Sequence, residues 1–251
     1  MLTSSIDVAQ VVLYAFWFFF AGLIFWLRKE DRREGYPLES DNPRRVARKE
    51  QPLMFASPKV FKLHDGGEYV APDFTRDTRE IPAERTSPAA GSPLEPTGDA
   101  MGSNVGPAAW AQRHDVAEVT IDGRDQVVPM RVDPEMTMFA GPDPRGWAVV
   151  GGDGQSPGKV KDIWVDRADV MVRYLEVELA AGGTRLIPMP MIQLRAATRT
   201  VEVYSIFGAH FAKVPTLKNP NQVTILEEEK ISAFYAGGRL YASPARLGPV
   251  L

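Results

Sequence analysis

The chain has 251 residues, a formal net charge of −3 and no cysteine. This length allows one globular domain with extended segments, and the nearly balanced charge gives no support for nucleic-acid binding. The absence of cysteine excludes disulfides, thiolate metal sites and cysteine nucleophiles, and it fits a cytoplasmic location.

An uninterrupted apolar run lies near the N-terminus. Residues 8–27 contain no charged side chain and are bounded by Asp7 and Arg28. About 20 helical residues span roughly 30 Å, the thickness of a bilayer's hydrocarbon core. No basic residue precedes the run and bulky residues end it, which counts against a cleaved signal peptide. The run predicts one membrane-spanning helix within a first segment of residues 1–35.

Charged and aromatic residues at the ends of the run predict its orientation. Basic residues follow the run and none precedes it, so the positive-inside rule places the N-terminus outside and the rest of the chain in the cytoplasm. The side chains expected to anchor the helix are Tyr14, Trp17, Trp26, Arg28, Lys29, Arg32 and Arg33. Each cation near anionic headgroups contributes on the order of 1 kcal/mol, and phospholipid is a candidate ligand.

Prolines dominate the next segment, residues 36–107, which holds ten of the chain's 21 prolines. Proline fixes φ and removes a backbone donor, so long helices and central strands are not expected. Apolar residues recur throughout, which counts against a free disordered linker. We interpret the segment as an extended strap laid along a partner surface, with a short hairpin over residues 59–70 that turns at Asp65-Gly66-Gly67.

The remaining residues, 108–251, have the pattern of a small β domain. The stretches expected to form strands are residues 116–121, 126–132, 159–165, 174–179, 184–187 and 201–204, where apolar and polar residues mostly alternate. Short strands joined by glycine-rich turns favour a small closed barrel or a sandwich. Thr224 and Glu227 have capping-box spacing and begin a helix that we expect to end at Gly237-Gly238, before a tail of residues 242–251.

Catalytic constellations are mostly missing from the sequence. The histidines, His64, His114 and His210, lie far apart and lack metal-ligand spacing. The glycine-rich residues 151–159 lack the hydroxyl residue of a phosphate loop, so a β-turn is expected there. Acidic residues gather around the predicted turns, and their simplest interpretation is a solvated surface. No metal site and no catalytic residue is predicted.

Several motifs, in order along nearly the whole chain, resemble the H subunit of purple-bacterial photosynthetic reaction centres. They are RKEDRREGYPLES, PTGDAMGSNVGPAAW, GKVKDIWVDRADVMVRYLEVEL, TRLIPM and EEEKISAFYAGGRLYASP, beginning at Arg28, Pro96, Gly158, Thr184 and Glu227. Residues 158–192 also resemble the PRC-barrel module. The implied fold is a single N-terminal transmembrane helix followed by a mainly-β cytoplasmic domain, a PRC-barrel-like small β-barrel with a C-terminal helix.

The resemblance implies a non-catalytic accessory subunit of a light-driven electron-transfer complex in the photosynthetic inner membrane. Such a subunit covers the cytoplasmic face of the L and M subunits, shields their quinone sites and assists proton delivery to the secondary quinone. The partners would carry bacteriochlorophyll, bacteriopheophytin, quinones and non-haem iron, and this chain would bind none of them directly. A light-harvesting antenna and a cytochrome subunit are further partners that the family allows.

The resemblance also implies candidate site residues. By family position, Asp166 is the aspartate of a WVD-x-x-[DE] motif, Asp169 is the motif's last acid, and Arg173 follows four residues later. These three are candidates for a proton relay and its electrostatic tuning. One branch of the family has a His-x-His pair where this chain reads DGRD, which counts against a transition metal there and leaves Asp122 and Asp125 as candidates for proton uptake.

Two other classes of function remain open on the sequence alone. A membrane-tethered PRC-barrel adaptor for another protein would share the span and the barrel, but it would not need the proline-rich strap or the motifs outside the barrel. A single-span enzyme would need a nucleophile with its base, or a set of metal ligands, which the sequence lacks. Near-infrared pigment that co-purifies with the chain would favour the reaction-centre subunit over the adaptor.

Overall fold

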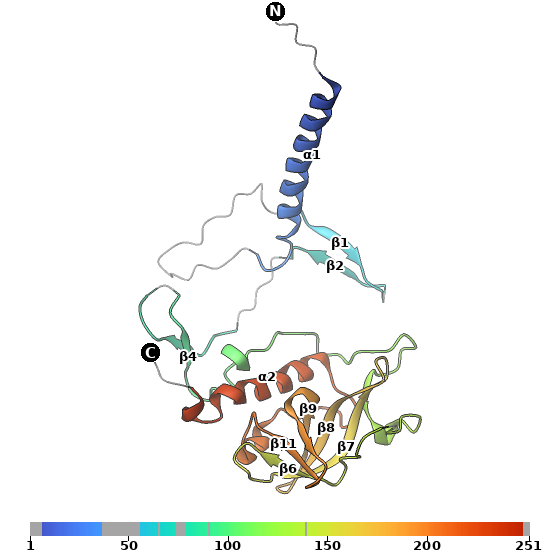
Figure 1. The fold of residues 1–251 in the computed structure, drawn as a ribbon, viewed down its shortest axis with the longest axis vertical. Helices are drawn as coiled ribbons and strands as arrows, with labels where there is room; N and C mark the ends of the chain where they lie inside the picture. The colour runs from blue at the N-terminus through green and yellow to red at the C-terminus, as the bar shows by residue number, and fades with distance from the viewer. Residues whose placement is uncertain are drawn as a thin grey trace, which may run out of the picture. The chain divides into compact units, whose positions relative to one another are not determined.

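The computed structural model describes residues 7–36, 56–64, 66–73, 79–89, 91–138 and 140–247. The chain divides into two compact units, one of residues 1–78 and 89–91 and the other of residues 79–88 and 92–251. Figure 1 shows the elements of both. The proline-rich segment, residues 36–107, contributes a hairpin to each of these units.

The first unit contains one long helix, α1 (Val8–Glu30). The Asp7 side chain caps it by accepting a hydrogen bond from the Ala9 backbone N–H at 3.1 Å. Among the described residues, α1 is the one helix long and apolar enough to cross a membrane, and none of its side chains is buried within the chain. The predicted apolar helix is thus present.

A β-hairpin completes the first unit. Strand β1 (Lys59–Lys62) pairs antiparallel with β2 (Glu68–Ala71), with Lys59 opposite Ala71 and Lys62 opposite Glu68. This confirms the hairpin predicted over residues 59–70. Of the predicted turn, Asp65 lies outside the described residues, and Gly66 has the positive φ of +84° that favours glycine.

The second unit is built on a seven-stranded sheet. Its strands are β5 (Val127–Pro129), β6 (Ala148–Gly151), β7 (Gly158–Asp166), β8 (Met171–Leu179), β9 (Thr184–Pro188), β10 (Gln193–Arg195) and β11 (Thr200–Val203). The order is β10-β11-β6-β7-β8-β9, with β5 also paired to β7, and every pair except β11–β6 is antiparallel. A separate small hairpin joins β3 (Ala83–Arg85) to β4 (Leu94–Pro96).

The strands β7 and β8 form the centre of this sheet. Three strands pair with β7, and its last five residues are all buried. Trp164, Ile163 and Leu175 are among the largest fully buried side chains, together with Phe211 and Tyr235 from later in the chain. Such burial of apolar area is the main stabilising contribution to the domain.

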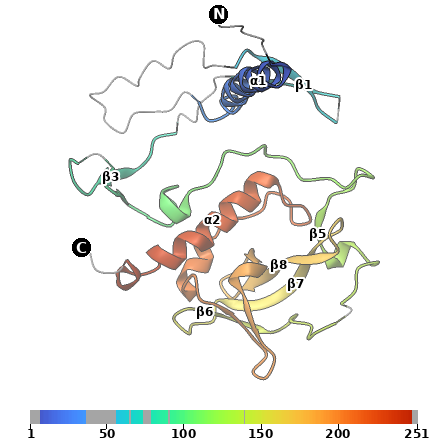
Figure 2. The same ribbon diagram turned by 45° about the horizontal axis from the view of Figure 1, so that its top comes forward.

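Helix α2 (Ile225–Tyr241) covers the sheet, as Figure 2 shows. The predicted capping box is present: the Thr224 hydroxyl accepts from the Glu227 N–H at 3.2 Å, and the Glu227 carboxylate accepts from the Thr224 N–H at 2.9 Å. The predicted end at Gly237-Gly238 is wrong, because the helix continues to Tyr241. The glycines serve close packing instead, since a Cβ on Gly238 would lie 2.4 Å from Ile206 Cγ2.

The strand predicted over residues 116–121 is wrong. This stretch contains turns and a single bridge between Val119 and Asp125, and Ile121 is almost fully exposed. The chain reverses at Gly123, which has a φ of +76°, and this leaves no length for a strand. The strand predicted over residues 126–132 is shorter than expected, because a 3₁₀ turn (Met130–Val132) follows β5.

Candidate functional site

A buried aspartate shapes the turn between β7 and β8. Asp166 is 1% exposed, and its Oδ1 accepts hydrogen bonds from the backbone N–H groups of Ala168 (2.9 Å) and Asp169 (3.1 Å). Gln126 Nε2 lies 3.1 Å from each of its carboxylate oxygens. Aspartate commonly organises a turn by bonding the backbone two and three residues on. Asp166 therefore fixes the position of the turn that follows it.

The tip of this turn is exposed. Asp169 lies there beside Val170 and Met171, whose side chains are 72% and 50% exposed. Val170 has a φ of +52°, which is costly for a β-branched residue and is maintained by the turn around it. The tip thus presents a carboxylate next to apolar surface.

Arg173 on β8 connects the turn to α2. Its Nη1 lies 4.0 Å from Asp166 Oδ2, and its Nη2 lies 3.7 Å from Glu228 Oε1. The same Glu228 oxygen accepts a hydrogen bond from the Tyr174 hydroxyl at 2.6 Å. Two predicted residues, Asp166 and Arg173, are thus brought together with two that the sequence did not indicate, Glu228 and Tyr174. We name these four residues the β8–α2 cluster.

Burial controls protonation in the β8–α2 cluster. Desolvation raises the pKa of Glu228 above its ordinary value, although the Tyr174 hydroxyl and Arg173 oppose that rise. Burial also raises the pKa of Tyr174, and the neighbouring Glu228 adds to the rise. A carboxyl whose pKa moves toward neutrality can both hold and release a proton near working pH. Glu228 is therefore suited to proton exchange.

A second group of buried charges surrounds Arg131. Its Nη1 donates to Asp162 Oδ2 at 3.1 Å and to Glu176 Oε2 at 2.5 Å, and both carboxylates are buried. Trp164 Nε1 donates to the same Glu176 oxygen at 3.0 Å. Arg131 Nη2 also donates to Asn221 Oδ1 at 3.1 Å. Because buried charges are tolerated when they are paired and hydrogen-bonded, this group has a structural role.

The remaining predicted residues, Asp122 and Asp125, lie outside these groups. Arg167 donates to the Asp125 carbonyl oxygen at 2.8 Å, and the Asp125 side chain accepts from Gln222 Nε2 at 2.9 Å. Asp122 is exposed and pairs with Arg124 at 3.4 Å. Asp125 thus contacts Arg167, the residue after Asp166, whereas Asp122 pairs with its neighbour Arg124 at the surface. The described residues contain no group of three or more histidine, cysteine, aspartate or glutamate side chains placed to hold a metal ion.

The predicted anchor residues are distributed along α1 and just beyond it. Tyr14, Trp17, Trp26 and Arg28 are exposed, and Lys29 and Arg32 are partly exposed, with the Arg32 guanidinium 5.4 Å from the Tyr36 ring centroid. Arg33 makes several close contacts with protein groups. It pairs with both Glu30 carboxylate oxygens at 2.7 and 2.9 Å, and its Nη1 donates to the carbonyl oxygens of Ser57 and Ala71, each at 2.8 Å.

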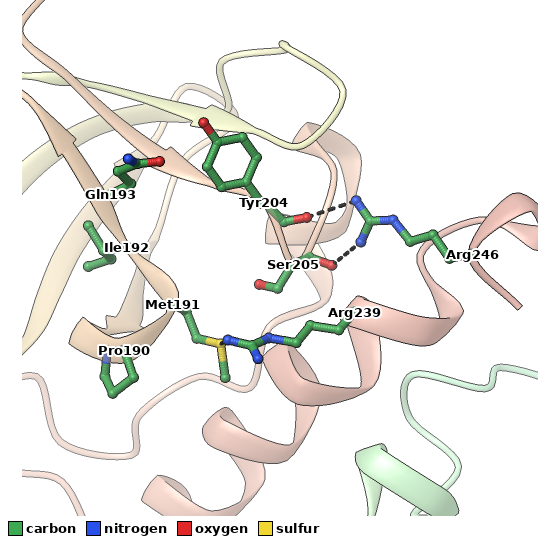
Figure 3. Close-up of a pocket in the computed structure, with 8 residues that line it drawn as sticks. All are labelled: Pro190, Met191, Ile192, Gln193, Tyr204, Ser205, Arg239 and Arg246. Carbon is green, nitrogen blue, oxygen red and sulfur yellow. Dashed lines mark hydrogen bonds between the residues drawn. The ribbon is translucent and has the colours of Figure 1, made fainter.

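A pocket of about 310 Å³ lies between β10 and the C-terminal residues (Figure 3). On one side Arg246 donates to the carbonyl oxygens of Ser205 and Gly238, each at 2.7 Å, and of Tyr204 at 2.8 Å. On another side Arg239 Nη2 lies 3.4 Å from Met191 Sδ. The prediction that residues 242–251 form a tail is wrong for the part that the structure describes, because a 3₁₀ turn (Pro244–Arg246) is fastened to the barrel by Arg246.

Comparison with known families assigns both units. A family model described as the photosynthetic reaction centre, H-chain N-terminal region, matches residues 1–132, and the PRC-barrel domain matches residues 136–207. The second match contains β6 to β11 and confirms the predicted barrel. The first match includes the span and the proline-rich segment, which an adaptor sharing only the barrel would not require. Because this match covers more than half of the chain, the protein belongs to the family of photosynthetic reaction centre H chains.

Proposed function

We propose that this chain is a non-catalytic structural subunit that covers the cytoplasmic face of the L and M subunits, shields their quinone sites and assists proton delivery to the secondary quinone. Membership of the H-chain family supports the first part, since H chains are structural subunits that associate with other reaction-centre subunits. The observation that carries the last part is the β8–α2 cluster, which lies directly behind the exposed acid at the β7–β8 tip.

The proposed topology is a single pass through the photosynthetic inner membrane, with the N-terminus in the periplasm. The apolar α1 and the basic Arg28 and Lys29 in its last turn support this orientation. Bacteriochlorophyll, bacteriopheophytin, quinones and non-haem iron are assigned to partner subunits. Lipids, an antenna and a cytochrome subunit remain proposed partners.

Proton delivery is the step that the residues of this chain can perform. Reduction of a quinone by two electrons to the quinol consumes two protons, and these must cross a region poor in water. Asp169 at the exposed tip can take a proton from solvent, and Glu228 can hold one because burial raises its pKa. Arg173 lies between Asp166 and Glu228 and stabilises negative charge on either. Protons would then move in short steps through these side chains.

Replacing Asp169 with Asn tests the proposed role in proton delivery. We expect slower proton-coupled reduction of the secondary quinone after a flash in the intact complex, while primary charge separation is unchanged, because the amide cannot exchange a proton at working pH. Glu178→Gln, which alters an exposed carboxylate elsewhere on β8, is the control and should leave both rates unchanged. Wild-type turnover in Asp169→Asn from about pH 5 to about pH 9 would remove Asp169 from the pathway.

A further inference from the structure

The β1–β2 hairpin is fastened to the end of α1. Arg33 binds the Glu30 carboxylate with its Nε and Nη2 and the carbonyl oxygens of Ser57 and Ala71 with its Nη1, so one side chain joins the last turn of the helix to the open end of the hairpin. The Arg33 side chain is only 14% exposed. If α1 crosses the membrane, the base of the hairpin therefore lies within one arginine's length of the membrane surface. Figure 1 shows the hairpin extending to one side of the helix end.

The two faces of the hairpin differ in charge. Because paired residues share a face, Lys59, Phe61, Tyr69 and Ala71 lie on one face, and Val60, Lys62, Glu68 and Val70 on the other. We name the first the aromatic face. Lys62 and Glu68 are opposite one another and balance, whereas the aromatic face has a lysine and no acid. The Lys59 ammonium lies 5.9 Å from the Phe61 ring centroid.

Several apolar side chains of the hairpin are exposed in the part of the chain that the structure describes, whereas Ala71 is buried. Phe61 and Tyr69 are 40% and 38% exposed, and Val60 and Val70 are exposed as well. A two-stranded hairpin alone is marginally stable in water, so a stable one needs a surface to lie against. Aromatic rings interleaved with lysine are the composition of segments that lie at a lipid–water interface, where the ring is buried among acyl chains and the ammonium reaches the phosphates.

We propose that the aromatic face of the β1–β2 hairpin lies on the cytoplasmic membrane surface and binds anionic lipid headgroups. The inference rests on the proposed function only in requiring that α1 spans the membrane. Charge favours anionic lipid over protein as the occupant of this face, since Lys59 adds to the cations Arg28 and Lys29 at the end of α1, and Glu30, the acid near Lys59, is already paired with Arg33. The opposite face, on which the charges of Lys62 and Glu68 cancel, would then be available to a partner subunit.

The absence of cysteine makes the test direct, because one introduced cysteine carries the only spin label. The full chain is placed in bilayers of phosphatidylcholine with or without phosphatidylglycerol. Labels are introduced singly as Tyr69→Cys on the aromatic face, Val70→Cys on the opposite face and Glu178→Cys on the barrel. Ala15→Cys within α1 reports whether the helix spans, and Phe61→Cys repeats the measurement should Tyr69→Cys not fold. Electron paramagnetic resonance then gives the accessibility of each label to oxygen and to a water-soluble nickel chelate.

We expect the label at Tyr69 to show severalfold lower nickel accessibility than those at Val70 and Glu178 in membranes with phosphatidylglycerol. The protection should weaken without phosphatidylglycerol, and also when Lys59→Gln is added. Nickel accessibility at Tyr69 equal to that at Glu178, with Ala15 in hydrocarbon, would overturn the proposal and leave the membrane span intact. If the label at Tyr69 became protected from nickel only after L and M subunits were added, the aromatic face would bind protein and the proposal would be overturned. A water-exposed Ala15 would overturn the span as well.

Discussion

The fold changes the proton affinity of Glu228, because burial raises the pKa of its carboxyl. Glu228 belongs to a run of glutamates at the start of α2, where acidic residues ordinarily favour the helix by interacting with its dipole. The fold places it against Tyr174, 54 residues earlier in the chain. The family motif indicated Asp166, Asp169 and Arg173, which lie within eight residues of one another in the sequence. Glu228 could not be indicated in this way, because only tertiary packing brings α2 to β8.

The Glu228 carboxyl should make stability depend on pH. Its pKa is raised in the folded state by burial, so its contribution to stability is fully present below the unfolded value near 4.5 and is lost as pH rises through the folded value. Glu228→Gln keeps an acceptor for Tyr174 and cannot ionise. We therefore expect the wild type to lose free energy of unfolding relative to this variant as pH rises from the unfolded value near 4.5 through the raised folded value. A difference in free energy of unfolding between wild type and Glu228→Gln that stays constant with pH in denaturant titrations would contradict this.

The Arg131 network should be sensitive to loss of its cation. Arg131→Met leaves Asp162 and Glu176 buried without their shared partner, which should cost about 3–5 kcal/mol in free energy of unfolding. Arg145→Met is the matched control, because it breaks an exposed pair with Asp143 and should cost about 1 kcal/mol or less. If urea titrations gave equal losses of free energy of unfolding for the two variants, burial would not determine how much an ion pair contributes to stability.

At the level of elements, the role of the glycine pair in α2 could not be predicted from the sequence. A glycine pair near the end of a helical pattern favours a stop, yet Gly237 and Gly238 lie inside α2. Their role depends on Ala108 and Ile206, which no local pattern identifies. The start of α2 could be predicted because the capping box is local in sequence. The alternation of apolar and polar residues over 116–121 predicted a strand that does not form. Exposed loop residues can alternate by chance, and no neighbouring strand among the described residues pairs with this stretch.

Gly158 at the start of β7 provides a test of strand packing. A Cβ there would lie 1.9 Å from the Glu178 carbonyl oxygen on β8, and backbone on that side cannot yield as a flexible side chain does. We expect Gly158→Ala to lower the free energy of unfolding by about 1–3 kcal/mol or more. Gly102→Ala, whose nearest neighbouring atom would be 3.9 Å away, should be neutral or slightly stabilising. Comparable thermal stability of the two variants would argue against the close approach.

At the scale of the molecule, the division into units separates anchoring from the barrel. The apolar core cluster of the described residues begins at Met101 and has no member from the first unit. Removing residues 1–27 should therefore abolish membrane attachment and weaken assembly with reaction-centre partners, while the barrel stays folded. Its near-ultraviolet circular dichroism, which arises partly from buried Trp147 and Trp164, should be retained.

The full chain with Ile163→Asp serves as the opposite control for this deletion. It places an unpaired charge at a fully buried position of β7, so it should lose the same near-ultraviolet signal while α1 still attaches it to membranes. Together the two variants separate attachment from folding. If the deletion also abolished the near-ultraviolet signal, the barrel would need the first unit in order to fold, and a core cluster that begins at Met101 would not be sufficient for it.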